Sequence, residues 1–527
     1  MKAKSGSGLI IVRHRVPITN SHTMMNKITF CLTVLFFLLS ALSPSILSAQ
    51  EKHYSNAVET RIKLVKKNLC AEIQVEGEPN WTLEERMKFY HVHGVSIAVI
   101  KNYKIDWARG FGWADSGERR PVKTSTLFQA GSMSKSLNAI GVLKLVQRGK
   151  LRLYEDIDKF ITTWKFPYDS VSRGKIITIA NLLSHTAGLT VHGFPGYEIG
   201  DTIPTLQQIL DGVPPANTPA VRSAFEPSLK GQYSGGGTII SQLIIQDAAG
   251  MFYDKFMQEN VLRPLDMAHS FFTQPPPTNK QKRLATGYYA DGKEVIGKYH
   301  IYPEQAAAGL WTTPTDMAKY IIETQLSLQG KSNKVLSQAM TKLMLIPYKN
   351  RTFALGVFID TIGEQIYFSH GGSDKGFIGR YFGSVDGGNG VVVMTNTDDI
   401  PIVNEIINSV AVVYKWKGFY RPFMTLKKKI LDDVVLGSYA GQYKNTAKSE
   451  GQFNLEPGSI FTITKAGHHL KAQTGNEQAI DIYPETDSVF FPKTSDTDIQ
   501  FIKDDNGVVC KLIVHQNGKY MESEKIK

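Results

Sequence analysis

The sequence predicts an α/β (α+β) protein: an antiparallel sheet flanked by helices, with an all-helical insertion, followed by a small C-terminal antiparallel β-barrel. Three observations support this prediction. Strand-like apolar runs lie towards both ends of the first 415 residues, and helix and loop patterns fill residues 150–345 between them. Residues 437–527 instead show short alternating runs separated by turns. We therefore expect one sheet built from two distant segments, and a separate barrel.

The N-terminal elements follow from local signals. Residues 55–72 are predicted as a helix, and Thr82 opens a second helix because Glu85 completes a capping box with it. Strands are expected at Val95–Ile100 and Lys104–Gly110. The short connection between these two runs predicts a hairpin.

The next elements complete the predicted sheet and its helices. A helix is expected to begin at Ser132, because apolar residues follow every three or four positions until Gly149 offers a stop. Another helix is expected over Pro401–Tyr414, which has an apolar face. Between them, strands are predicted at Gln365–Ser369, Gly376–Gly383 and Gly390–Thr395.

The pattern of apolar and polar residues changes near residue 416, and this change sets the predicted domain boundaries. Residues 416–436 form a basic, irregular linker that includes Lys427, Lys428 and Lys429. We predict a signal peptide at 1–49, a main domain at 50–415, this linker, and a barrel domain at 437–527. The barrel strands are expected around Phe461–Ile463, Leu470–Gln473, Val489–Phe491, Ile499–Ile502 and Val508–Val514.

The N-terminus carries the pattern of a secretory signal peptide. Lys27 precedes the apolar run Ile28–Leu42, and small residues follow up to a predicted cleavage site after Ala49. Because a positive n-region normally lies close to the start, translation is predicted to begin at Met24 or Met25. The run is short for a membrane span, and a retained signal anchor is the alternative. We expect a periplasmic or secreted protein with no stable membrane span after cleavage.

Composition excludes some functions. With 42% hydrophobic and 20% charged residues, the chain can bury a full core. The net charge falls from +12 to +7 once residues 1–49, which hold five Lys or Arg and no acid, are removed. Since no long basic cluster remains, nucleic-acid binding is not expected. Cys70 and Cys510 are predicted to be two separate buried thiols, with a single bridge between them as the alternative.

The first candidate for chemistry is Ser132-Met133-Ser134-Lys135. Residues three apart share a helix face, so the Lys135 amine is expected close to the Ser132 hydroxyl. A serine becomes a nucleophile when a base takes its proton, and a desolvated neutral lysine is such a base. The helix N-terminus also favours a developing anion. A lone Ser-x-x-Lys is weak evidence, because serine and lysine are common residues.

Two further motifs supply the remaining parts of acyl-transfer chemistry. Tyr233 precedes three glycines and an apolar helix, where it is a candidate proton shuttle. His370-Gly371-Gly372-Ser373 follows a predicted strand, and its glycines would let a ligand lie against the strand edge. Taken singly, a turn tyrosine and a tight bend explain these motifs better.

The order of the three motifs is that of penicillin-recognising serine enzymes. The chain resembles that superfamily, and in particular the class C β-lactamase and penicillin-binding-protein-related serine hydrolases. Leu182–Leu189 and Ala307–Ala318 also match family segments, and the resemblance covers roughly residues 60–415. Residues 437–527 resemble the lipocalin-like domain appended to many of these hydrolases. The resemblance implies a β-lactamase-like sheet.

The resemblance also assigns roles. Ser132 matches the acylated nucleophile, Lys135 its base partner and Tyr233 the proton relay. The backbone N–H groups of Ser132 and Ser373 would form the oxyanion hole, beside Gly371 and Gly372 in the substrate-binding strand. His185, in one of the family segments, is expected to fix the backbone by hydrogen bonding.

Two positions depart from the family pattern. Gly235 stands where the family has a substrate-binding asparagine, and His370 stands where β-lactamases have a lysine. Histidine is mostly neutral at pH 7, so recognition of a substrate carboxylate is expected to weaken. Both departures argue against efficient β-lactam hydrolysis and leave the acyl-serine step intact.

The predicted function is a serine hydrolase that cleaves an ester or amide through an acyl-Ser132 intermediate, with peptides containing D-residues as the substrates the family suggests. Three alternatives stay open: a β-lactamase or D-alanyl-D-alanine carboxypeptidase, an acyltransferase, and a non-catalytic sensor. No metal or organic cofactor is implied. The expected partner is a small-molecule ester, amide or peptide, and the oligomeric state is not predicted.

Overall fold

The computed structural model describes residues 53–70, 73–420, 424–446, 458–475, 479–516 and 519–526. The chain divides into two units, Met1–Ser55 and Asn56–Lys527, and the description below concerns the second. The predicted signal peptide lies outside the described residues. Within the described part of the chain, no helix combines the length and the apolar composition needed to cross a membrane.

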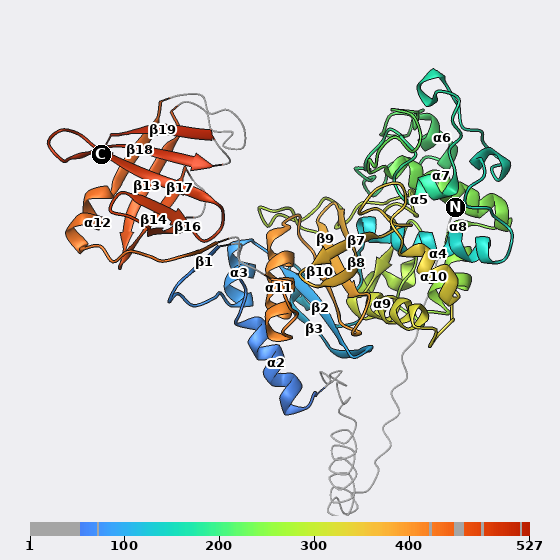
Figure 1. The fold of residues 1–527 in the computed structure, drawn as a ribbon, viewed down its shortest axis with the longest axis horizontal. Coiled ribbons are helices and arrows are strands. Elements are labelled where there is room, and N and C mark those ends of the chain that lie inside the picture. Colours follow the sequence, from blue (N-terminus) through green and yellow to red (C-terminus); the bar gives the residue numbers. More distant parts are fainter. Residues whose placement is uncertain are drawn as a thin grey trace, which may run out of the picture. The chain divides into compact units, whose positions relative to one another are not determined.

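The central element is a seven-stranded sheet with the order β4-β3-β2-β10-β9-β8-β7, in which every pair is antiparallel. As predicted, its strands come from two distant segments, and β2 lies beside β10 (Figure 1). The predicted hairpin is the β2–β3 pair. The strands are β2 (Gly94–Lys101), β3 (Lys104–Asp115), β4 (Arg120–Pro121), β7 (Phe358–Ile362), β8 (Gln365–Asp374), β9 (Phe377–Ser384) and β10 (Gly390–Thr395).

Helices cover both faces of this sheet. Every residue of β10 is buried, which requires cover on each side. On one side α9 (Pro314–Leu328) packs on β2, β9 and β10; on the other, α11 (Pro401–Val413) packs on β9 and β10. Figure 1 shows α11 beside α2 (Asn56–Lys66) and α3 (Leu83–Phe89) on the side away from α9.

The segment between β4 and β7 forms the helical insertion. Its helices α4 and α7 are largely buried and pack against each other, so they belong to the core. The α-helices are α4 (Ser134–Gln147), α5 (Ile179–Leu183), α6 (Leu206–Asp211), α7 (Gly235–Ala249), α8 (Tyr253–Met257) and α10 (Gln338–Met344). Short helical turns are η1 (Gly131–Met133), η2 (Ile157–Lys159), η3 (Ser170–Ser172), η4 (Gln258–Leu262) and η5 (Thr278–Arg283), and a two-stranded ribbon joins β5 (Phe128–Gln129) to β6 (Trp311–Thr312).

The C-terminal strands close into an eight-stranded barrel, as the sequence predicts. Buried aromatic side chains such as Tyr439, Tyr443 and Phe501 pack in its core. Cys70 and Cys510 are separate free thiols, but the expected burial of Cys510 is wrong, because the alternation along β18 places it on the outer face. The elements are α12 (Asp433–Tyr439), β12 (Gly441–Asn445), β13 (Ile460–Ala466), β14 (His469–Thr474), β15 (Ile480–Pro484), β16 (Val489–Pro492), β17 (Thr497–Lys503), β18 (Val509–Gln516) and β19 (Lys519–Lys525).

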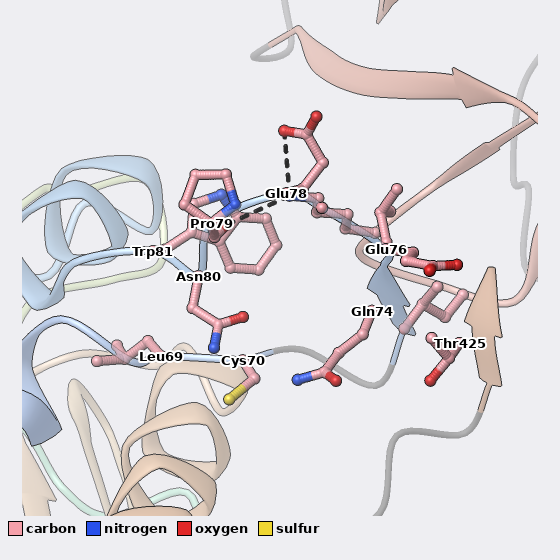
Figure 2. A pocket seen from close by; sticks show the side chains of 13 residues that line it. Leu69, Cys70, Gln74, Glu76, Glu78, Pro79, Asn80, Trp81 and Thr425 are labelled. Carbon is pink, nitrogen blue, oxygen red and sulfur yellow. Dashed lines mark hydrogen bonds and ion pairs between the residues drawn. The ribbon is translucent and has the colours of Figure 1, made fainter. Parts of the chain in front are cut away.

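A small parallel pair joins two other segments. β1 (Ile73–Val75) lies beside β11 (Met424–Leu426), and no sequence signal predicts this pairing. Figure 2 shows the pocket next to it, a cavity of about 250 Å³ lined in part by Cys70, Gln74 and Trp81. The nucleophile candidate Ser132 does not line this pocket, so it is distinct from the site described below.

A buried ion pair ties α3 to α11. The predicted capping box of Thr82 and Glu85 begins α3 and sets the direction of that helix. The Arg86 guanidinium then donates two hydrogen bonds to the Glu405 carboxylate, at 2.6 and 2.7 Å, and both side chains are buried. The ring of Trp81 lies 3.8 Å from the guanidinium carbon, so the cation is covered on that side.

Removing one member of this ion pair should lower the free energy of unfolding more than removing both members. In Glu405→Leu the Arg86 charge stays buried without its partner, and the free energy of unfolding should fall by about 3–5 kcal/mol in denaturant titrations. The double variant Arg86→Leu/Glu405→Leu leaves no unpaired charge and should recover much of that loss. A double variant as unstable as Glu405→Leu would contradict this account.

Candidate active site

Ser132 lies on a tight turn that leads directly into a buried helix. The turn η1 places Ser132 just before α4, so the predicted helix begins two residues later than expected. Gly131 has a φ of +50°, which a side chain would disfavour. The Ser134 hydroxyl donates to the Gly131 carbonyl at 2.6 Å and holds the turn closed.

Lys135 lies one turn along, as the spacing predicts. Its Nζ is 3.0 Å from the Ser132 Oγ and donates to the Ala307 carbonyl at 2.8 Å. The side chain is buried, so the contact to Ala307 fixes the amine next to the hydroxyl. The family segment that begins at Ala307 thus supplies a positioning contact for Lys135.

Tyr233 directly precedes the N-cap of α7 and faces the same site. Its ring centroid is 5.0 Å from the Lys135 Nζ and 4.2 Å from the His185 ring. The Tyr233 hydroxyl is buried and has no hydrogen-bond partner among the described residues. Leaving a buried hydroxyl without a hydrogen-bond partner costs free energy. The Tyr233 hydroxyl is therefore available to form a hydrogen bond with a substrate.

His185 holds the backbone at Tyr233, as expected. Its Nδ1 accepts the N–H of Ser234 at 3.2 Å, and its carbonyl accepts the N–H of Gln232. Burial, together with the nearby Lys135 charge, holds the pKa of His185 well below its ordinary value. The imidazole is therefore neutral and acts as an acceptor.

Glycines let the nucleophile turn lie directly on β8. A Cβ at Gly372 would come within 1.9 Å of the Ala130 carbonyl oxygen, and one at Gly131 within 2.5 Å of the Ser373 nitrogen. β7 pairs with β8 only as far as Ser369, which leaves the edge of the next residues open. This packing brings the backbone around Ser132 and the backbone around Ser373 into contact. The strand itself continues through the predicted bend to Asp374.

Asp374 is a positioning residue that the sequence did not indicate. One of its carboxyl oxygens accepts the N–H of Gly131 at 3.1 Å, and the side chain is buried. Burial raises the pKa of Asp374 well above its usual range. Burial also raises the pKa of Glu304 to about 8, and this residue lies three positions before Ala307. No sequence signal marked Asp374, because it lies beyond the predicted strand Gln365–Ser369 and only the structure extends β8 to it.

His370 is buried beside the candidate nucleophile. Its ring lies 4.8 Å from that of Phe358 and 6.2 Å from that of Tyr233. Burial, with a smaller contribution from the Lys135 charge, lowers the pKa of His370 to about 3. The His370 imidazole is thus neutral across the physiological pH range, and its protonated fraction there is smaller than the ordinary pKa of histidine would give.

Gly235 begins α7 and has no room for a side chain. A Cβ there would lie 2.8 Å from the Phe194 ring and 3.3 Å from the His192 carbonyl oxygen. The Phe194 ring therefore fills space beside the position where the family carries asparagine. The sequence did not indicate that an aromatic ring would pack where the family has an amide side chain.

Some of these residues meet in one cleft of about 490 Å³, whereas Lys135, His185 and Gly235 do not line it. Ser132, Tyr233 and the strand His370–Ser373 line it, together with apolar side chains such as Phe358. Sequence reasoning missed the polar residues Arg380 and Asn404 that line the same cleft. They come from β9 and α11, and only the tertiary fold brings these two elements to the site.

The close approach at Gly372 can be tested by adding one methyl group. In Gly372→Ala the turn must move away from β8, and acylation of Ser132 should slow about 100-fold or more, the cost of losing one oxyanion donor. A fluorophosphonate probe measures the rate. In Gly371→Ala the nearest atom is 3.8 Å away, so its thermal unfolding midpoint should match the wild type. Labelling of Gly372→Ala at the wild-type rate would refute this packing argument.

The low pKa of His370 predicts acid sensitivity. The unfolded chain binds a proton near pH 6.5, whereas the folded protein does not until about pH 3. The contribution of His370 to stability is therefore complete above pH 6.5 and falls by about 1.4 kcal/mol per pH unit between these values. Denaturant unfolding of wild type and His370→Gln from pH 7 to pH 4.5 should show a shallower decline in the variant. Parallel declines would contradict the assignment.

Comparison with known proteins agrees with the geometry. A family model described as Beta-lactamase matches residues 81–407. Penicillin-binding protein 4* of Bacillus subtilis (strain 168) is 22% identical, over 85% of this chain and 98% of that protein. Protein flp of Staphylococcus aureus (strain N315) is 26% identical over 63% of this chain; the match spans 66% of that protein, just under two thirds of its length.

Solved structures show the same fold. The octameric penicillin-binding protein homologue from Pyrococcus abyssi superposes with a TM-score of 0.54 at 20% identity, over 84% of this chain and 98% of that one. FmtA from Staphylococcus aureus gives 0.50 at 19% identity, over 66% of this chain and 91% of that one. The C-terminal eight-stranded barrel fits the predicted lipocalin-like domain. With more than half of its length matched by the family model, the chain belongs to the Beta-lactamase family.

Proposed function

We propose that the protein is a periplasmic or secreted serine hydrolase that cleaves an ester or amide through an acyl-Ser132 intermediate. One observation carries the proposal: the Lys135 Nζ lies 3.0 Å from the Oγ of Ser132, and Ser132 lines a cleft together with Tyr233, whose hydroxyl has no hydrogen-bond partner among the described residues. A nucleophile, a base within hydrogen-bond reach and a second proton carrier are the parts that acyl transfer requires.

The reaction begins with attack by Ser132. Its Oγ bonds to the substrate carbonyl carbon as the hydroxyl proton passes to the Lys135 Nζ, which must enter this step unprotonated to act as the base. The N–H groups of Ser132 and Ser373 receive the oxyanion, and the N-terminus of α4 favours the same negative charge. The bond to the leaving group then breaks, and the Tyr233 hydroxyl delivers a proton to it while Lys135 restores the tyrosine proton. Water then gives a proton to the same pair and attacks the acyl carbon; the bond from that carbon to the Ser132 Oγ breaks, the acid product leaves, and the pair returns the proton to Oγ.

The residues around Ser132 limit the class of substrate that the site can bind. Penicillin recognition in the family uses an amide at the Gly235 position and a cation at the His370 position. Here the Phe194 ring lies against Gly235, and His370 is neutral. We therefore favour an ester or a peptide, including peptides with D-residues, over a β-lactam. The leader-like run at Ile28–Leu42 supports export, and the boundaries 1–49, 50–415, 416–436 and 437–527 remain our proposed domain limits.

Probe labelling tests the nucleophile and its base. A fluorophosphonate should label the wild type and fail to label Ser132→Ala. Lys135→Met should slow labelling by about 100-fold or more, since it removes the general base. Lys144→Met is the matched control, because this lysine lies on the same helix but donates to the Val335 carbonyl away from the cleft. It should keep the wild-type rate. If wild type neither reacts nor hydrolyses esters, the protein is a non-catalytic sensor.

A substrate panel separates the remaining alternatives. p-Nitrophenyl esters, D- and L-amino-acid anilides and nitrocefin should be compared in wild type and Ser132→Ala. We expect ester or anilide turnover to exceed nitrocefin turnover. Rapid nitrocefin hydrolysis would favour a β-lactamase or a D-alanyl-D-alanine carboxypeptidase. Transfer of the acyl group to added alcohols or amines in preference to water would identify an acyltransferase.

A further inference from the structure

Two contacts join exposed segments of the helical insertion in pairs. The ring of Tyr154 stacks on that of Tyr348, with the two centroids 6.0 Å apart. An ion pair connects the Lys175 ammonium to the Glu226 carboxylate. Segments that are distant in sequence therefore lie side by side on the surface of the insertion.

The loop before β7 joins these segments to each other and to the cleft. A Cβ at Gly231 would lie 2.8 Å from the Phe353 ring and 3.6 Å from the Asn350 Cβ, so the segment before Tyr233 adjoins this loop. The Phe353 ring also lies 5.3 Å from that of Phe358, which lines the cleft. We call the exposed surface of the four segments the mixed face; it comprises residues 152–155, 173–176, 226–230 and 346–351.

The mixed face exposes large apolar side chains. Their exposed fractions are 62% for Leu229, 58% for Ile346, 57% for Tyr154 and 47% for Ile176. Single exposed apolar side chains are ordinary, but several on adjoining segments mark a binding surface. Aliphatic side chains together with a tyrosine suit the boundary between lipid headgroups and acyl chains.

The same face carries a net charge of +4. Its two acids are already paired, Glu226 with Arg173 and Lys175, and Glu155 with Lys159. Six basic side chains of the face are exposed: Arg152, Arg173, Lys175, Lys230, Lys349 and Arg351. The charge of the mixed face therefore complements an anionic surface.

The combination of these features selects a lipid surface over a soluble polyanion. A soluble polyanion would pair with the cations but would leave the aliphatic side chains in water. An anionic bilayer offers both a layer of phosphate groups and an apolar medium beneath it. It therefore satisfies the charged and the apolar side chains of the face together.

We propose that the mixed face docks the protein on an anionic phospholipid surface. The side chains of Leu229, Ile346 and Tyr154 enter the boundary between headgroups and acyl chains, while the exposed lysines and arginines contact lipid phosphates. Docking in this way brings the bilayer next to the side of the cleft that Tyr233 lines. The inference goes beyond the proposed hydrolase function and does not rest on the reactivity of Ser132.

Hydrogen exchange in the presence of vesicles tests the proposal on the full chain. With phosphatidylcholine vesicles that contain about 30% phosphatidylglycerol, the amides of residues 228–230 and 346–351 should exchange about threefold or more slowly than with phosphatidylcholine alone. Exchange in the exposed barrel turn 504–508 should not change. Because this readout is local, it separates the mixed face from any lipid binding by the apolar run Ile28–Leu42. Unchanged exchange on the mixed face would overturn the proposal.

Two double variants separate the charged from the apolar contribution in vesicle co-sedimentation. Lys230→Gln/Lys349→Gln should weaken binding to the anionic vesicles about 30-fold, because each cation near the lipid surface contributes about fivefold. Leu229→Ser/Ile346→Ser should weaken it about tenfold or more, because less apolar surface leaves water. Loss in the lysine variant without loss in the apolar variant would indicate a site for soluble polyanions and overturn the lipid proposal.

Matched variants elsewhere on the surface serve as controls. Lys63→Gln/Lys67→Gln removes two exposed lysines at α2, which packs against α11, and should keep the wild-type affinity. Ile430→Ser/Val434→Ser removes two apolar side chains that are more exposed than those of the mixed face, and should keep it as well. If these controls lose as much affinity as the variants of the mixed face, lipid binding is unspecific and the proposal fails.

The outcome is independent of the proposed activity. All four double variants replace exposed side chains, so their thermal unfolding midpoints should match that of the wild type. If the wild type hydrolyses no ester, the proposed function fails while hydrogen exchange and co-sedimentation still decide on the mixed face.

Discussion

The contact between the nucleophile turn and β8 is the constraint on which the site depends. Two positions without a Cβ, Gly131 and Gly372, allow backbone to lie on backbone there. The Asp374 carboxyl group bonds the Gly131 N–H and secures the turn from the strand side. α4 then places Lys135 one turn beyond Ser132, and the Ala307 carbonyl holds the amine next to the hydroxyl. Hydrogen-bond donors fixed in this way need little reorganisation when charge develops.

The polarity of the cleft follows from what surrounds that contact. Burial keeps His185 and His370 neutral, and the Phe194 ring packs beside the bare start of α7. The side nearer α11 instead carries Arg380 and Asn404. A substrate would therefore meet hydrogen-bonding and apolar groups near the nucleophile and a positive charge across β8.

Much of this arrangement was predictable from local patterns. Three-residue spacing indicated the proximity of Ser132 and Lys135, and strand-like apolar runs indicated β2, β3 and β8. Asp374, Arg380 and the Phe194–Gly235 contact were not predictable, because each depends on a strand register or on a loop that returns from elsewhere in the chain. The short strand β7 and the β1–β11 pair were missed for the same reason: their partners, rather than their own sequence, make them strands.

The pairing of β2 with β10 also has a consequence for how the chain acquires its structure. The β2–β3 hairpin joins neighbouring residues and can form early. The other edge of β2 pairs with β10, which lies almost at the end of the segment that the family model matches, so that edge stays unpaired until β10 has been made. Until then an apolar strand with unpaired N–H and C=O groups is exposed, which is a template for association with other chains. A chain made from its N-terminus would carry that open edge until β10 has been synthesised, so its productive folding depends on late closure of the sheet.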